Sequence, residues 1–201
     1  MNRRFALLAP IAFCLTALPV LAAEKLSLKD ISQALNALKT VKGAFTQIND
    51  DGSITTGTIY IKRPGRARFE YNPPAPALVM AGGGQVAIFD PKSNLPPEQY
   101  PLKRTPLNLI LKRNVNLNQE NMVVGHDFDG TTTSVTAQDP KNPELGTIKM
   151  IFSGPPIELR QWVITNQDGS QTTVILGDVT RGGSIASSLF SIPTEINKRG
   201  L

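Results

Sequence analysis

The only histidine of the chain, His126, is the first residue that could carry chemistry. Two carboxylates, Asp127 and Asp129, follow it closely in the sequence. A histidine with two acids could bind a metal ion, but metal sites usually need further histidine or cysteine ligands. Because Asp129 and Gly130 form a common turn sequence, we expect His126 in a solvated turn. The sequence therefore predicts no metal site and no cofactor.

Catalytic motifs are lacking elsewhere in the sequence. It contains no Gly-x-Ser-x-Gly, Ser-x-x-Lys or His-Glu-x-x-His pattern. The paired acids Asp50 and Asp51 stand in a predicted turn, and the glycines at 82–84 are not followed by the Lys-Ser/Thr of a phosphate loop. We therefore expect that the protein is not an enzyme.

The first 22 residues have the composition of a secretory signal. Arg3 and Arg4 precede an apolar stretch over 5–21, and small residues at 22 and 23 suit cleavage after either. A buried N-terminal helix is the weaker alternative. We expect residues 1–22 to be a signal peptide, residues 23–201 to form one domain, and the mature protein to lie in the periplasm.

Composition limits the remaining classes. The one cysteine, Cys14, lies inside the signal, so the mature chain is expected to have neither a disulfide nor thiol chemistry. The net charge is +5, of which the two signal arginines supply part. Such mild basicity, without aromatic residues among the basic ones, argues against nucleic acid as a partner.

Two helices are predicted. Ser27 and Asp30 resemble a capping box, and apolar residues follow at helical spacing, with one apolar face formed by Ile31, Ala34, Leu35 and Leu38. Thr105 and Pro106 supply a cap and a first-turn proline for a short helix over 107–112. Because that short helix is apolar on most sides, we expect it to be buried against a sheet as a plug or a lid.

Alternating hydrophobicity predicts strands between and after the helices. The expected strands, separated by Gly, Asp and Pro turns, cover 54–63, 66–71, 85–89, 131–137, 147–152, 157–165 and 171–179. Regular short strands favour a curved antiparallel sheet whose concave side is covered by the two helices. Such a sheet either encloses an apolar ligand or has a filled core, and periodicity leaves both open.

The segment IKRPGRARFEY, residues 61–71, combines strand alternation with basic residues. Arg63 has the same parity as Ile59 and Ile61, so it would leave the strand on the apolar side. A buried guanidinium needs acceptors, and free carbonyl oxygens at helix ends would supply them. An arginine bonded to a movable cover would act as a latch. The alternative is that the strand frays and Arg63 turns to solvent.

At this segment the chain resembles the periplasmic lipoprotein carriers of the LolA type. The resemblance runs from about Lys25 to Ile196 and includes the sequence motifs VKGAFTQ at 41–47, IKRPGR at 61–66, RFEYNPP at 68–74, FDP at 89–91, YPL at 100–102, TPL at 105–107 and LFSIP at 189–193. It implies a mainly β fold with short helices, an incomplete antiparallel β-barrel closed by a helical lid. It also implies a cavity that holds the acyl chains of lipoproteins.

The resemblance assigns roles to individual residues. The family's lid-latching arginine falls on Arg63. We expect the acyl-chain cavity to be lined by Ile59, Ile61, Ala67, Phe69, Tyr71, Val79, Leu109 and Ile110. The family usually has a large apolar residue where Ala67 stands, so this methyl group could enlarge the cavity, loosen the lid or change the cargo. Arg66 and Arg68 lie on the opposite strand face, either solvated or as a docking patch for an acidic partner.

Partners also follow from the resemblance. Family members receive cargo from an inner-membrane ABC lipoprotein-release complex and deliver it to an outer-membrane lipoprotein receptor, and we expect a monomer. A carrier of another lipid or glycolipid, or a regulatory protein that senses lipoproteins, stays open as an alternative because fold does not fix the ligand.

Overall fold

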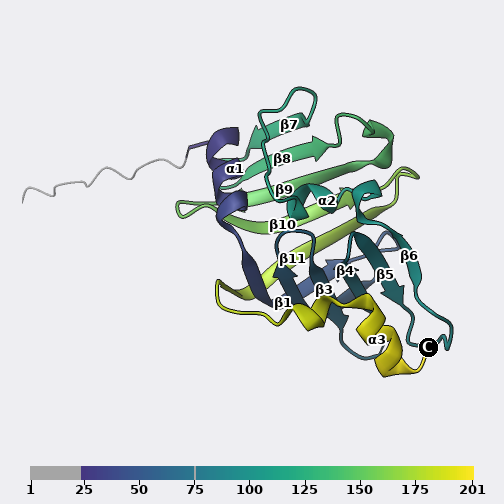
Figure 1. Ribbon diagram of the computed structural model, residues 1–201. Coiled ribbons are helices and arrows are strands. Elements are labelled where there is room, and N and C mark those ends of the chain that lie inside the picture. Colours follow the sequence, from purple (N-terminus) through teal and green to yellow (C-terminus); the bar gives the residue numbers. More distant parts are fainter. Residues whose placement is uncertain (1–23, 75) are drawn as a thin grey trace, which may run out of the picture.

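The computed structural model describes residues 24–74 and 76–201. The expected signal peptide, with Cys14, lies outside the described residues. One antiparallel sheet of eleven strands dominates the structure, in the order β6-β5-β4-β3-β2-β1-β11-β10-β9-β8-β7 (Figure 1). The strands are β1 Thr40–Ile48, β2 Ile54–Lys62, β3 Ala67–Tyr71, β4 Leu78–Gly82, β5 Gln85–Phe89, β6 Glu98–Pro101, β7 Val123–Phe128, β8 Thr133–Gln138, β9 Thr147–Ser153, β10 Glu158–Thr165 and β11 Gln171–Arg181.

The sheet is curved and open, as the sequence predicted. Its order runs from β6 at one edge to β7 at the other, with β1 and β11 paired in the middle. Neighbouring strands are mostly consecutive in the chain because short turns join them, which is what antiparallel pairing permits. The inner side chains form one large buried cluster that extends from Phe45 and Ile59 to Met150 and Trp162. The fold is therefore a mainly β half-barrel with a continuous apolar inner face.

Helix α1, Leu28–Ala37, lies across one end of the strands (Figure 1). The predicted cap is confirmed, because the Asp30 backbone N–H donates to Ser27 Oγ at 3.1 Å. Ile31 and Leu35 are buried in the main cluster. The apolar stripe of α1 thus packs against the inner side of the half-barrel.

His126 does not lie in a turn, and that prediction is wrong. It is a half-buried residue of β7, and its Nε2 lies 2.9 Å from the Leu26 carbonyl oxygen just before α1. The Asp-Gly turn begins three residues later, at Asp129, where the next residues fold back into β8. The histidine therefore helps to attach the start of α1 to the sheet.

Helix α2, Asn108–Leu111, is the short apolar helix expected from the sequence. Its residues Leu109, Ile110 and Leu111 are all buried in the main cluster. The Gly65 N–H donates to the Leu111 carbonyl oxygen at 2.9 Å, which joins the helix to the β2–β3 turn. Together α1 and α2 cover the concave side of the sheet. No helix among the described residues is both long and apolar enough to cross a membrane.

The C-terminal segment covers the opposite face of β3, β4 and β5. It contains a 3-10 turn, η3 Ser187–Phe190, and helix α3, Ile192–Arg199. Ile192 joins a second buried cluster with Leu78, Met80, Ala87 and Phe89. A further short turn, η1 Leu102–Arg104, precedes α2, and η2 Pro143–Leu145 precedes β9. Neither α3 nor this second cluster was expected from the sequence.

Arg68 is buried beneath this C-terminal segment, so the expectation of a solvated face is wrong for it. Its side chain is 8 % exposed. Nη1 donates to Glu195 Oε2 at 3.0 Å and to the Leu189 carbonyl oxygen at 3.2 Å, while Nε donates to Glu70 Oε1 at 2.6 Å. Arg66 is less buried, and its Nη1 donates to Ser187 Oγ at 3.3 Å. Arg68 therefore holds α3 on the sheet and cannot meet a partner directly.

Candidate functional site: a covered apolar face with a pocket

Arg63 lies where the two covering helices meet the sheet. It follows β2 directly and is 7 % exposed, so of the two alternatives that its sequence position left open, burial on the side of Ile59 and Ile61 is the one observed. Its Nη1 donates to the Leu38 carbonyl oxygen at 3.3 Å, and its Nη2 donates to the Lys112 carbonyl oxygen. Leu38 is the C-cap residue directly after α1, and Lys112 is the C-cap residue directly after α2. One guanidinium thus satisfies carbonyl oxygens at the ends of both helices.

Within residues 24–74 and 76–201, no acidic side chain forms an ion pair with Arg63. Its hydrogen-bond acceptors are two backbone carbonyls and, at 3.5 Å, Asn36 Oδ1. Burial lowers the pKa of the Arg63 guanidinium below its usual value. Its Nε is buried and has no hydrogen-bond partner among the described residues. A buried cation with an unused donor is costly, so this contact stabilises the closed arrangement only modestly.

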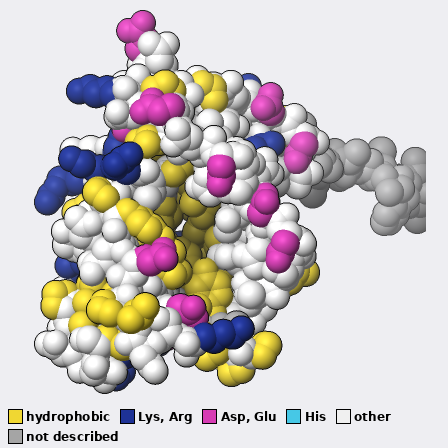
Figure 2. Space-filling model, turned by 90° about the vertical axis from the view of Figure 1, so that its right-hand side faces the viewer, with side chains coloured by type: hydrophobic (Ala, Val, Ile, Leu, Met, Phe, Trp, Pro, Cys, Tyr) yellow, Lys and Arg dark blue, Asp and Glu magenta, His cyan; other side chains and the backbone are white. Residues whose placement is uncertain are grey.

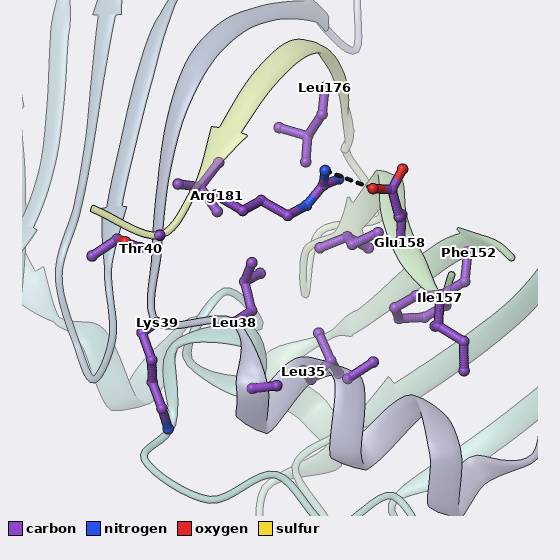
Figure 3. A pocket seen from close by; sticks show the side chains of 14 residues that line it. Leu35, Leu38, Lys39, Thr40, Phe152, Ile157, Glu158, Leu176 and Arg181 are labelled. Carbon is purple, nitrogen blue, oxygen red and sulfur yellow. Dashed lines mark hydrogen bonds and ion pairs between the residues drawn. The ribbon is translucent and has the colours of Figure 1, made fainter. Parts of the chain in front are cut away.

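A pocket of about 330 Å³ opens beside α1. Figure 3 shows Leu35 and Leu38 of the helix side facing Phe152 and Leu176 of the strands and Ile157 of the turn between β9 and β10. The remaining lining comes from Ala34, Ala37, Lys39, Thr40, Val41, Glu158, Leu159, Arg181 and Gly182. Its volume is near the lower end of the range for small-molecule sites, about 300–1,000 Å³. The pocket is mostly apolar and suits hydrocarbon.

An ion pair crosses the rim of this pocket. Arg181 extends from the end of β11 toward Glu158 on β10, and Nη1 lies 2.8 Å from Glu158 Oε1 (Figure 3). The other carboxylate oxygen lies 2.6 Å from Arg160 Nη2. Both arginine side chains are partly exposed, so the pair is accessible to water.

The residues predicted to line a cavity lie together, but in the filled core rather than in the pocket. Ile59, Ile61, Ala67, Phe69, Leu109 and Ile110 are buried in the main cluster, and Tyr71 and Val79 are half-buried against it. The pocket is lined by a different set of residues. The physical reason is α2, whose leucines and isoleucine fill the concave space. An enclosed space walled by the predicted residues would require α2 to move.

Aromatic side chains occupy the middle of the inner face. Phe45 packs edge-on against Phe69 and Tyr71, with ring centroids 5.5 and 5.2 Å apart, and Phe69 meets Trp162 at 6.4 Å. The Tyr71 hydroxyl donates to Gln47 Oε1 at 2.6 Å, and burial raises the pKa of Tyr71 to about 12. On the side turned away from α1, Figure 2 shows a hollow with hydrophobic side chains on its floor.

Sequence reasoning missed the residues that form the pocket rim. Glu158 and Arg181 stand near strand ends, where alternating charges usually indicate a solvated face. Their opposite charges were the one available signal, but nothing in the sequence places residue 181 beside residue 158. Their meeting depends on how β10 and β11 diverge, which is a tertiary feature.

The fold and site define an open antiparallel half-barrel whose apolar face is covered by helices and entered by a pocket. The model of the family described as "Outer membrane lipoprotein carrier protein LolA" matches residues 36–193. The chain belongs to this LolA family.

Individual relatives are distant in sequence. An outer-membrane lipoprotein carrier protein of Azotobacter vinelandii is 25% identical over 200 residues, which cover 93% of this chain and 92% of that protein. One from Pseudomonas aeruginosa is 22% identical over 179 residues, 85% of each chain. A crystal structure of a LolA superfamily protein from Nitrosomonas europaea matches with a TM-score of 0.42 and 10% identity, covering 83% of this chain and 98% of that one.

Proposed function

We propose that this protein is a periplasmic carrier that binds lipoproteins through their acyl chains, beneath the cover formed by α1 and α2. Family membership supports a carrier role, and the apolar pocket supports hydrocarbon as the ligand. The pocket beside α1 is the part of the binding space that is already open. The space walled by Ile59, Ile61, Ala67 and Phe69 becomes available when α2 moves away.

The position of Arg63 is the observation that carries this proposal. A permanent core would be sealed by apolar contacts, whereas here a buried guanidinium joins the ends of both covering helices. Its hydrogen bonds can be exchanged for bonds to water, so they can break when cargo enters. Arg63 therefore acts as the latch of the cover.

A carrier must bind its cargo weakly enough to release it. Each buried methylene contributes about 0.8 kcal/mol, so a fully enclosed multi-chain anchor would be bound almost irreversibly. Opening the cover requires breaking the Arg63 contacts and exposing the leucines of α2. The free energy needed to open the cover lowers the net affinity for the cargo. The same free energy is released when the cover closes after delivery.

The route proposed for the cargo follows the family. The protein would take lipoproteins from an inner-membrane ABC release complex and pass them to an outer-membrane lipoprotein receptor. Residues 1–22 would be the export signal and residues 23–201 one carrier domain. Carriage requires binding and release only, so no catalytic group is assigned.

Depletion of the protein in its native host tests this function. We expect outer-membrane lipoproteins to accumulate at the inner membrane within the depletion period. Mass spectrometry of the protein extracted from the periplasm should identify acylated polypeptides. Finding only free lipids or glycolipids would overturn lipoprotein carriage and favour a lipid shuttle, and unchanged lipoprotein sorting would contradict the proposal.

A further inference from the structure

The wall of the half-barrel is split between β10 and β11. Among the described residues, antiparallel pairing between these strands covers only Gln161–Thr165 with Gln171–Ile175. Beyond that point, Glu158 and Leu159 pair only with β9, and Val179–Arg181 pairs only with β1. Gly177, Asp178, Thr180 and Arg181 are exposed. The two strands thus diverge toward the end of the sheet that carries α1.

Two β-bulges at the same level cause the divergence. On β11, Gly177 and Asp178 together oppose the single residue Ala44 of β1. On β10, Arg160 is an extra residue between the pairs that Leu159 and Gln161 make with β9. A bulge bends its strand and increases the local twist, so adjacent bulges separate neighbouring strands.

Backbone N–H and C=O groups of β11 point into the split. The Gly182 N–H donates to the Thr40 carbonyl oxygen at 3.1 Å, so this residue points toward β1. Because successive residues of an antiparallel strand point to opposite sides, the N–H and C=O of Arg181 and Val179 point into the split. These groups form a short edge inside the sheet, where an extended chain could pair.

The split connects two different environments. On its inner side lies the apolar pocket, lined there by Leu159, Leu176 and Arg181. On its outer side lies a polar pocket of about 250 Å³ lined by Arg160 and by Gly177–Arg181. Arg181 belongs to both pockets. The Glu158–Arg181 ion pair crosses the boundary, and because it is partly exposed it is a weak barrier.

We propose that the split binds the polypeptide that follows the acylated residue of a lipoprotein, in extended conformation along β11. This inference rests on the proposed function, because it takes the apolar pocket as the site of the acyl chains. A lipoprotein anchor joins hydrocarbon directly to backbone amides, which matches an apolar pocket joined to a free strand edge. A lipid headgroup, in contrast, would leave the backbone N–H and C=O groups of Val179 and Arg181 unused.

Three synthetic probes test the pairing with the full chain. The first is a short peptide with palmitoyl chains on its N-terminal cysteine, the second is the same peptide with N-methylated backbone amides after that cysteine, and the third is the acylated cysteine amide alone. Removing one or two backbone hydrogen bonds should weaken binding of the second and third probes by about tenfold relative to the first. Equal affinity for all three overturns the inference and leaves lipoprotein carriage intact. Binding of none contradicts the proposed function itself.

Variants of β11 provide a second readout. Val179→Pro removes an N–H that points into the split. This variant should bind the unmodified lipidated peptide more weakly than the wild type does, but should bind the acylated cysteine amide equally well. Thr172→Ala is the control on the same strand, because Thr172 pairs with Ile164 in the part of β11 that stays joined to β10 and belongs to neither pocket beside the split. We expect this control to bind all three probes as the wild type does. If Val179→Pro loses affinity equally for the lipidated peptide and for the acylated cysteine amide, this edge has no role in peptide binding.

Discussion

The guanidinium of Arg63, at the end of β2, donates a hydrogen bond to the carbonyl oxygen of Lys112 at the end of α2. The same side chain donates to the carbonyl oxygen of Leu38, the C-cap residue of α1, at 3.3 Å. The carboxyl ends of both elements that cover the apolar face are therefore bonded to the same side chain of the sheet. The proposed opening of the cover would therefore break hydrogen bonds at both helix ends at once.

Replacing the latch tests its role in release. Arg63→Leu should still bind lipoprotein but transfer it poorly, because the closed state no longer recovers the contacts that help to expel cargo. Hydrogen exchange of the α1 and α2 amides should become faster, since their ends lose a common partner. Arg63→Lys keeps the charge, but its compact ammonium cannot match the planar fork, so intermediate transfer is expected. Transfer by Arg63→Leu at the wild-type rate would show that the latch assignment is incorrect.

Ala67 offers a test of the buried space. Ala67→Phe should overfill the inner face, lower the free energy of unfolding by about 1–3 kcal/mol and reduce cargo affinity. Ala87→Phe is the matched control, because Ala87 is equally buried but packs on the outer face beneath α3. It should lower stability similarly and leave cargo affinity unchanged. Chemical denaturation measures the stability of the two variants, and binding titrations measure their cargo affinity. If Ala67→Phe and Ala87→Phe change cargo affinity equally, position 67 has no special role.

The close approach of β11 to β1 beside the bulge should require glycine at position 43. A Cβ at this position would lie 2.2 Å from the Asp178 carbonyl oxygen, so the backbone would have to shift. Gly43→Ala should therefore lower the free energy of unfolding by roughly 1–3 kcal/mol, as overpacking in a well-packed region does. Gly177→Ala, on the facing strand, should be nearly neutral. Urea denaturation of the two variants compares them directly, and equal midpoints would contradict the close approach.

Glu195 should make stability depend on pH in the acid range. Burial alone would raise the pKa of Glu195, but hydrogen bonds from Arg199 and Arg68 outweigh it and hold the pKa below its usual 4.5. Since the folded-state pKa is lowered, this stabilisation is fully present above the unfolded value and is lost as pH falls through the folded value. Thermal melts between neutral pH and about pH 3 should show a smaller loss for Glu195→Gln than for the wild type. Parallel curves would exclude this contribution.

Much of the fold could be predicted from local patterns. The cap at Ser27, the strand Gln85–Phe89 and the buried helix around Leu109 each depend on neighbours in the sequence, and all three are confirmed. The strand Thr40–Ile48 was not assigned, although its motif had been noted, because Gly43 and Ala44 interrupt the alternation where the bulge forms.

The site was harder to predict because its contacts join distant residues. Strand parity, a local property, offered burial of Arg63 as one of two alternatives, the other being a side chain that turns to solvent. The burial of Arg68 depends on Glu195, 127 residues away, and no local pattern indicates that the C-terminal helix covers β3. The pocket depends on the divergence of β10 from β11, so Glu158 and Arg181 could not be paired from the sequence alone.

The central claim, that acyl chains lie inside the half-barrel, can be measured through Trp162. It is the only tryptophan of the chain, is 1% exposed, and is the next buried side chain on β10 after Leu159 of the pocket. Binding of a lipidated peptide with brominated acyl chains should quench Trp162 fluorescence strongly, whereas the same peptide with unbrominated chains should not. If the brominated peptide binds and the fluorescence is unchanged, the acyl chains lie elsewhere and the account is contradicted.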